Sequence, residues 1–248
     1  MRDWVKGLAR RALLTDGVRR LTLSVANGQV DEQAIAELWL GWGNPQWSAT
    51  SDMLSVLASH MLRPATRTVL ECGSGVSTIV MGIAAEFTGA QVVSLEADAE
   101  WHAQMSRTIE RFNLRNVDIR HAPIERQAAA DWYAAPAVAD LSRVDLFVCD
   151  GPRGETRGGR SGALAHVVPL LAGNATIVID DVHRAPEREL AARFRDATDG
   201  REVQWGRPSR QFAVIDTTAV HAPLADPYAD MGVLKAPRSR EPAALRIG

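Results

Sequence analysis

Apolar residues recur along the central part of this chain with two alternating periods, and the alternation predicts its architecture. Apolar runs of strand length are RTVLEC, QVVSLE, VDIRH, VDLFVCD and ATIVID. Helical spacing fills the segments around and between them: DMLSVLASHML, about 77 to 87, about 98 to 112, GALAHVVPLL and PERELAARFRDA. Strands that alternate with helices pair in parallel through right-handed crossovers. The pattern therefore predicts an α/β fold with a doubly wound, mostly parallel sheet and helices on both faces.

The C-terminal part follows a different pattern. REVQWG and RQFAVID are strand-like runs separated only by RPS, a spacing typical of an antiparallel hairpin, here at one edge of the sheet. Beyond Thr217 prolines are scattered and no period is sustained, which predicts a loosely held tail. We therefore expect a helical cap over residues 1–50, the sheet domain over 51–217 and the tail over 218–248.

The first 25 residues mix apolar and basic side chains at helical spacing. The apolar positions include Leu8 and Leu13, and the basic ones include Arg10 and Arg11. Such a helix either packs on the edge of a domain with its charges in water or lies on an anionic membrane surface. The sequence leaves both interpretations open. A second helix, DEQAIAELWLGW, is predicted to begin at Asp31.

The amino-acid composition limits the kinds of binding partner and the cellular compartment that are expected for this protein. The chain has 248 residues, 46% of them hydrophobic, which is enough for one sizeable core, and its net charge of -2 indicates no nucleic-acid partner. Cys72 and Cys149 end apolar runs outside any CxxC or Cys/His cluster and are predicted to be buried, reduced thiols. No stretch approaches the roughly 20 apolar residues of a membrane span, and the N-terminus lacks the apolar core of a secretory signal. A cytoplasmic protein is therefore expected, with no indication of its oligomeric state.

The stretch ECGSGVST lies where the first central strand ends and a helix begins. In an open parallel sheet ligands bind outside the carboxyl ends of the strands, so this turn is the first candidate for a binding site. Gly73 and Gly75 permit a tight turn, and the helix N-terminus offers unpaired N–H groups. The NAD fingerprint needs a small residue where Thr78 stands. Glu71, two residues before Gly73, disfavours a diphosphate and favours an ammonium group.

A second acidic residue, Glu96, stands at the tip of the next strand, QVVSLE. A carboxylate there can accept hydrogen bonds from both hydroxyls of a ribose, a role found in nucleoside-binding folds. The alternative is a solvated carboxylate that caps the following helix, although Asp98 is the better cap.

The order of these motifs resembles that of the class I S-adenosylmethionine-dependent methyltransferases, a Rossmann-like family: Glu71-x-Gly73-x-Gly75, Glu96, RHAPIE after the third strand, DLFVCDGP at the fourth and the closing hairpin. The resemblance covers about residues 51–216 and implies a sheet of seven strands with the last one antiparallel. It also implies S-adenosylmethionine as cofactor, with its methionine half on the glycine turn and its ribose at Glu96. The cofactor residues implied in this way are Glu71, Gly73, Ser74, Gly75, Ser77, Glu96, Ala97, Ala122, Pro123 and Asp150, with Ile124 also bordering the adenine.

Acidic residues follow the fourth and fifth predicted strands, in CDGPRGETRGGR and IDDVHRAPER. Asp150, Asp180 and Asp181 come from neighbouring strand ends and are candidate oxygen ligands of one divalent cation, with Mg as the first choice. A metal there would hold an acceptor hydroxyl and lower its pKa. The arrangement is similar to that of the catechol-type and macrocin-type O-methyltransferases. In the alternative, Asp180 caps the next helix, Asp181 pairs with Arg184, and Asp150 faces the cofactor and acceptor.

Methyl transfer also needs a group that removes the acceptor's proton. His183 is a candidate general base because imidazole titrates near working pH, alongside the carboxylates of Asp150 and Asp181. It is equally a loop histidine that hydrogen-bonds at the surface. The arginines of the glycine-rich loop either clamp an anionic group of the acceptor or are solvated. They are Arg153, Arg157 and Arg160.

Together these motifs predict an S-adenosylmethionine-dependent methyltransferase that acts on a small-molecule acceptor, at oxygen rather than nitrogen. The segment DGPR departs from the Asn/Asp-Pro-Pro-aromatic element of many nitrogen-directed methyltransferases. Two alternatives stay open, namely a nicotinamide-dependent oxidoreductase on a related fold and a non-catalytic binding module.

Overall fold

The computed structural model describes residues 2–43 and 47–217; the expected tail at 218–248 lies outside the described residues. Within them the chain forms a seven-stranded sheet in the order β3-β2-β1-β6-β7-β9-β8. The first five strands in this order pair in parallel, and β9 is antiparallel to both of its neighbours. The predicted fold class is confirmed, including the C-terminal hairpin at one edge. The strands are β1 (Thr68–Cys72), β2 (Gln91–Glu96), β3 (Val117–His121), β6 (Val144–Cys149), β7 (Leu171–Ile179), β8 (Arg201–Arg207) and β9 (Arg210–Asp216).

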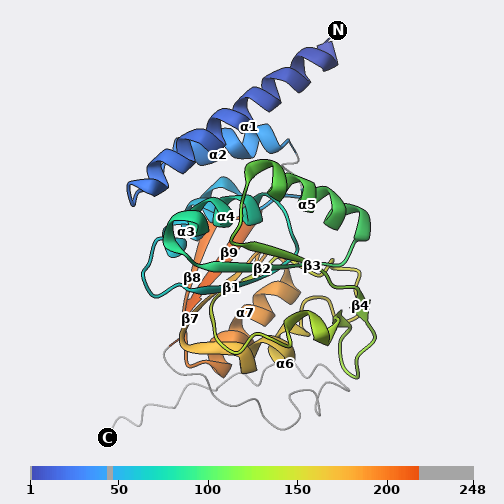
Figure 1. Ribbon diagram of the computed structural model, residues 1–248. Coiled ribbons are helices and arrows are strands. Elements are labelled where there is room, and N and C mark those ends of the chain that lie inside the picture. Colours follow the sequence, from blue (N-terminus) through green and yellow to red (C-terminus); the bar gives the residue numbers. More distant parts are fainter. Residues whose placement is uncertain (1, 44–46, 218–248) are drawn as a thin grey trace, which may run out of the picture.

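Successive side chains of each central strand enter different apolar cores, because strand residues alternate between the two faces of a sheet. Val69 of β1 belongs to the core under α3 (Ser51–Met61), α4 (Val76–Thr88) and α5 (Ala99–Phe112). Leu70, the next residue, belongs to the core under α6 (Ala163–Val167) and α7 (Ala185–Ala197). Figure 1 shows these two helical layers on opposite faces of the sheet.

Three segments depart from the sequence prediction. The predicted helix GALAHVVPLL shortens to α6 and the 3-10 helix η2 (Val168–Leu170), because Pro169 has no N–H to continue an α-helix. Strand β7 begins at Leu171, earlier than predicted, because an irregularity in its pairing with β6 accommodates extra residues. A second sheet of β4 (Ile124–Glu125) and β5 (Trp132–Tyr133) replaces part of an expected loop, and the 3-10 helix η1 (Ala135–Val138) follows it.

The N-terminal segment forms a helical hairpin of α1 (Arg2–Ala26) and α2 (Glu32–Trp42), which lies over α4 as an additional layer (Figure 1). Asp31 caps α2 by accepting a hydrogen bond from the Ala34 N–H, and it also pairs with Arg20 at 2.8 Å. Leu21, Leu38 and other hairpin residues share one apolar core with α3 and α4. No helix of the described residues is long and apolar enough to cross a membrane.

Two glycines allow α1 and α2 to approach at backbone distance. A Cβ added at Gly17 would lie 2.5 Å from the Leu38 amide nitrogen and 2.8 Å from the Ala34 carbonyl oxygen. Gly41 of α2 packs in the same way against the backbone of Leu14 in α1. The hairpin therefore depends on the absence of side chains at its helix crossing.

Replacing Gly17 with Ala should lower the free energy of unfolding by about 1–3 kcal/mol, because the added methyl group forces the helices apart. Gly7→Ala is the matched control, since a Cβ at Gly7 in the same helix meets nothing within 4 Å. That control should raise stability by up to about 1 kcal/mol through helix propensity. Urea denaturation of both variants measures the difference, and equal stabilities would contradict the proposed packing constraint.

Candidate active site

The glycine turn after β1 closes against the end of β6. Gly73 has φ of +91°, and a Cβ there would lie 3.1 Å from the Gly151 nitrogen and 3.3 Å from the Asp150 carbonyl carbon. The Asp150 N–H donates to the Cys72 carbonyl at 3.0 Å. Glycine is therefore required at position 73 both for its conformation and for the close backbone contact. This contact brings the turn beside the first of the catalytic candidates.

Glu71 lies beneath the turn and is hydrogen-bonded to three hydroxyl groups. Its side chain is fully buried and accepts hydrogen bonds from Ser77 Oγ at 2.5 Å, Thr78 Oγ1 at 2.6 Å and Ser94 Oγ at 2.6 Å. Thr78 Oγ1 in turn accepts from the Gly75 N–H at 2.9 Å. The carboxylate thus ties the turn and the start of α4 to β1 and β2, and its contact with the amino acid moiety of the cofactor stays a prediction.

Burial raises the pKa of Glu71 from 4.5 to about 7, despite the opposing effect of the surrounding hydroxyl groups. A neutral hydroxyl donates a hydrogen bond without supplying a positive charge, so it compensates only part of the desolvation of a carboxylate. Glu71 is therefore an unusually basic carboxylate beneath the turn.

Glu96 joins the turn to the end of β2. Its Oε2 accepts from the Ser74 hydroxyl at 2.7 Å and from the Ser74 N–H at 3.2 Å, while Oε1 accepts from the Asp98 N–H at 2.9 Å. Asp98 caps α5, as the sequence suggested, by accepting from the Trp101 N–H at 2.8 Å. Each carboxylate oxygen has two lone pairs, so these contacts leave acceptor capacity for a ligand.

The remaining residues of the predicted cofactor set line the same strand ends with unequal exposure. Ala97 is half-buried, and Ala122, which donates its N–H to the Glu96 carbonyl at 2.7 Å, is fully buried. Pro123 is exposed, and Ile124 is half-buried. Their contact with an adenine stays a prediction.

Two tryptophans, one from α5 and one from α2, also support the glycine turn. Trp101 of α5 donates its indole N–H to the Ser74 carbonyl at 2.9 Å. Trp42 at the end of α2 packs edge-on against Trp101, with 6.2 Å between ring centroids. The N-terminal hairpin thus reaches the turn through a pair of indole rings, a contact that sequence spacing could not reveal.

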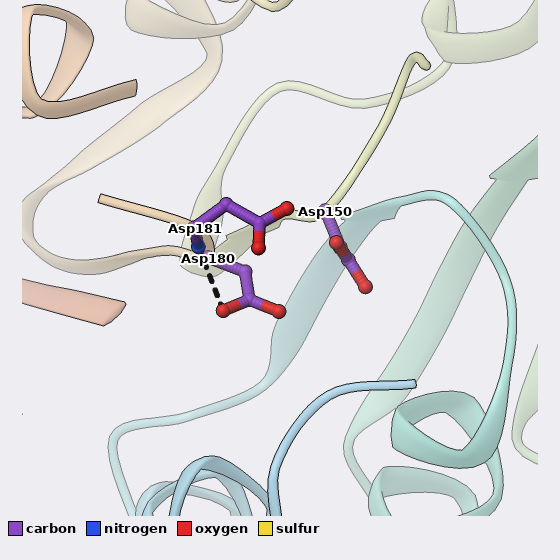
Figure 2. Close-up of side chains that lie close together, drawn as sticks. All are labelled: Asp150, Asp180 and Asp181. Atoms are coloured by element: carbon purple, nitrogen blue, oxygen red, sulfur yellow. Dashed lines mark hydrogen bonds between the residues drawn. The ribbon is translucent and has the colours of Figure 1, made fainter. Parts of the chain in front are cut away.

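Three carboxylates gather where β6 and β7 end (Figure 2). One ligand oxygen from each of Asp150, Asp180 and Asp181 lies within 4.8 Å of those of the others. The strands place them there because the Asp180 N–H donates to the Cys149 carbonyl at 3.1 Å and so extends the parallel ladder. Asp181 adopts φ of +64°, and its N–H donates to Asp180 Oδ1 at 2.7 Å, the dashed contact of Figure 2.

Arg160 is buried in this group of carboxylates. Its Nη2 lies 3.1 Å from Asp150 Oδ1 and 3.1 Å from Asp181 Oδ2, and also donates to the Asp150 carbonyl at 2.6 Å. Its Nη1 donates to the Asp180 carbonyl at 3.0 Å. Arg184, from the start of α7, adds a second guanidinium 3.1 Å from Asp181 Oδ2.

The residues present do not fit a magnesium ion at these carboxylates. Magnesium needs oxygen ligands about 2.0–2.1 Å away in an octahedral arrangement. Here a positively charged nitrogen is already within hydrogen-bonding distance of two of the three candidate ligands, Asp150 and Asp181. The alternative pairing of Asp181 with Arg184 matches the observed contact. The predicted capping role of Asp180 is wrong, because α7 begins after Arg184 and Asp180 bonds to Asp181 instead.

Burial and mutual repulsion act together on these carboxyl groups. Burial, followed by the charge of Asp180, raises the pKa of Asp150 well above its ordinary value, and Arg160 opposes the shift. Burial and the charge of Asp181 raise the pKa of Asp180 in the same direction. The group therefore includes carboxylates with enhanced affinity for a proton.

The other predicted residues of the acceptor side are placed differently. His183 Nδ1 lies 4.0 Å from Asp181 Oδ1, beyond hydrogen-bonding distance, and is buried without a hydrogen-bond partner among the described residues. Arg157 pairs with Asp131 at 2.6 Å and so braces its own loop, and Arg153 is exposed. Of the three loop arginines expected to clamp an acceptor, Arg157 and Arg160 are therefore used within the protein.

A family described as methyltransferase domain matches residues 70–182, the segment that runs from β1 through the glycine turn to the acidic group. These residues therefore form a methyltransferase domain, and the match supports the resemblance to the class I S-adenosylmethionine-dependent methyltransferases. This methyltransferase has no match among curated protein sequences. The methyltransferase domain supports an enzyme of this class over the nicotinamide-dependent and non-catalytic alternatives.

Solved structures share the methyltransferase's fold at low sequence identity. An O-methyltransferase from Bacillus cereus in complex with SAH is 16% identical, covers 75% of this chain and 90% of its own, and has a TM-score of 0.54. A putative O-methyltransferase from Klebsiella pneumoniae is 20% identical, with coverages of 76% and 90% and a TM-score of 0.52. TomG from Streptomyces achromogenes, an O-methyltransferase of tomaymycin synthesis in complex with SAM, is 13% identical, with coverages of 76% and 89% and a TM-score of 0.53.

The titration of Glu71 should be visible in the stability of the methyltransferase. Its folded pKa, about 7, exceeds its ordinary 4.5, so its stabilising contribution is full below pH 4.5 and is lost as pH rises through 7. Glu71→Gln removes this titration, and the wild type should therefore lose about 3 kcal/mol relative to the variant across that window. Denaturant unfolding from pH 4.5 to 8, with the exposed Glu110→Gln as control, measures the loss. Parallel pH profiles for wild type and Glu71→Gln would show that the Glu71 pKa is not raised.

Proposed function

We propose that this methyltransferase transfers a methyl group to a hydroxyl oxygen of a small-molecule acceptor, and that Asp150 accepts the hydroxyl proton. The position of Asp150 carries the proposal, because it stands where the glycine turn and the acidic group meet. Its backbone is bonded to Cys72 and packed on Gly73, and its carboxylate faces Arg160. Its side chain is also more accessible than that of Asp181, 23% exposed against 12%, and Asp180 is buried.

S-adenosylmethionine supplies an activated methyl group when bound, so the protein's task is to orient the acceptor and to handle one proton. As the new bond between carbon and oxygen forms, the bond between the methyl carbon and sulfur breaks. The O–H bond of the acceptor breaks as well, and its proton passes to the Asp150 carboxylate. The raised pKa of Asp150 favours this step, since a base works best when its pKa approaches the operating pH.

Cofactor binding at the turn and at Glu96 is supported by the free acceptor capacity of Glu96 and by the glycine backbone at a helix N-terminus. Oxygen as the acceptor atom is supported by the similarity to O-methyltransferases in complex with SAH and SAM. A small acceptor, rather than a nucleic acid, agrees with the net charge of -2.

Glu96→Ala should weaken S-adenosylhomocysteine binding by about 10- to 150-fold, because a hydrogen bond to a charged group contributes about 1.5–3 kcal/mol. Glu100→Ala is the matched control, an exposed glutamate on the adjoining helix. Calorimetric titration of both variants gives the dissociation constants. Equal affinity in wild type and Glu96→Ala would remove Glu96 from the ribose site.

Asp150→Asn should lower kcat for methyl transfer by about 10²- to 10⁴-fold, the range of general base catalysis, and leave S-adenosylhomocysteine affinity nearly unchanged. Formation of S-adenosylhomocysteine with a panel of phenols, catechols and sugars measures the rate. The control is Asp140→Asn, whose carboxylate pairs with Arg120 away from the acidic group. Undiminished turnover would exclude Asp150 as the base, whereas a parallel loss of affinity would make it a cofactor residue instead.

A further inference from the structure

We infer that Arg160 is the resident cation of the acidic group, so that methyl transfer proceeds without a divalent metal ion. The inference rests on the proposed function, because it concerns how Asp150 is held for the acceptor. It draws on the position of one buried guanidinium with respect to the three carboxylates.

A turn formed by two glycines just before Arg160 determines the position of this residue. Gly158 and Gly159 both have positive φ, +81° and +55°, which turns the loop back toward the ends of the strands. A Cβ added at Gly158 would lie 2.5 Å from the Ala130 Cβ, so the loop also packs closely on the segment before β5. The residue that follows this turn is then carried beneath the carboxylates.

Arg160 is built into the site by contacts with the ends of two neighbouring strands, β6 and β7. Besides its ion pairs it donates to the backbone carbonyls of Cys149 at 3.4 Å, Asp150 at 2.6 Å and Asp180 at 3.0 Å. Only 6% of the residue is exposed. If the guanidinium left this position, the buried backbone carbonyls would lose their hydrogen-bond donor and two carboxylates would lose their ion-pair partner. Displacement of Arg160 by a metal ion is therefore unfavourable.

The charges of the group are compatible with this role. When all groups are ionised, the three carboxylates and the guanidinium groups of Arg160 and Arg184 have a net charge of -1, and this charge is available to the acceptor. A divalent ion added beside Arg160 would reverse that balance and repel the guanidinium. The arginine therefore replaces the metal instead of assisting it.

Arg160 also orients the proposed base. It contacts Asp150 through Oδ1 and through the carbonyl of the same residue, which fixes the carboxylate and leaves Oδ2 for a proton from the acceptor. Arg160 is thus a positioning residue that acts through Asp150. A metal in the same place would instead coordinate the acceptor hydroxyl directly.

Removal of the charge should convert the acidic group into a metal site. Arg160→Met keeps an unbranched apolar stem and removes the cation. Arg153→Met, at an exposed position in the same loop, is the matched control. The full-length proteins are stripped with EDTA and titrated with Mn²⁺ by calorimetry and electron paramagnetic resonance. We expect one Mn²⁺ per chain in Arg160→Met, bound at least tenfold tighter than by wild type or Arg153→Met, and lost when Asp180→Asn is added.

Two outcomes would overturn the inference. One is saturable Mn²⁺ binding by the wild type that Asp180→Asn abolishes, and the other is absence of any gain of binding in an Arg160→Met protein that keeps wild-type circular dichroism. If Arg160→Met does not fold, Arg160→Gln and the wild-type titration take its place. Titration with S-adenosylhomocysteine separates this test from the proposed function, because cofactor binding can fail or succeed regardless of the Mn²⁺ result.

Discussion

The contact between the backbone of Gly73 and that of Asp150 and Gly151 is the constraint on which the site depends. Two neighbouring parallel strands end at the same level, and the chain leaving one of them passes against the chain leaving the other with no room for a side chain. This contact sets the distance between the turn, where the cofactor is proposed to bind, and the carboxylate proposed to receive the proton. Any residue larger than glycine at position 73 would push the glycine turn away from Asp150, even with every polar side chain in place.

The protein solves the same problem, the burial of a carboxylate, in two different ways. Glu71 is surrounded by neutral hydroxyl donors, which fix its orientation but offset only part of the cost of desolvation, so its pKa rises to about 7. Asp150 and Asp181 are instead held by a guanidinium, which supplies an opposing charge as well as donors. The first arrangement suits a structural support whose charge has no task. The second places a positive charge beside the carboxylate that is proposed to receive a proton, although burial still raises the pKa of Asp150.

The sequence predicted most of the fold because its determinants are local. The periods of the strands and helices and the three-residue interval in the final hairpin are properties of neighbouring residues. They failed where Pro169 or an irregular strand pairing intervened, and where β4 and β5 form a second sheet in an expected loop. The positions of the acidic residues at the strand ends follow from the same logic. Their partners do not: Ser94 meets Glu71 through the register of β1 and β2, and Arg160 meets Asp181 across a loop and a strand. The sequence predicted magnesium from the spacing of carboxylates, which indicates possible ligands but cannot reveal a buried arginine that contacts two of them.

The edge-on pair of Trp42 and Trp101 connects the N-terminal hairpin to the glycine turn. One indole ends α2, and the other donates its N–H to the carbonyl of Ser74 in the glycine turn. A shortened protein that starts at α3 would uncover an aromatic surface and loosen the wall behind its own cofactor turn. The boundary that the sequence suggests near residue 50 is thus crossed by a contact that supports the glycine turn, and the outermost helical layer is part of the structure around the candidate site.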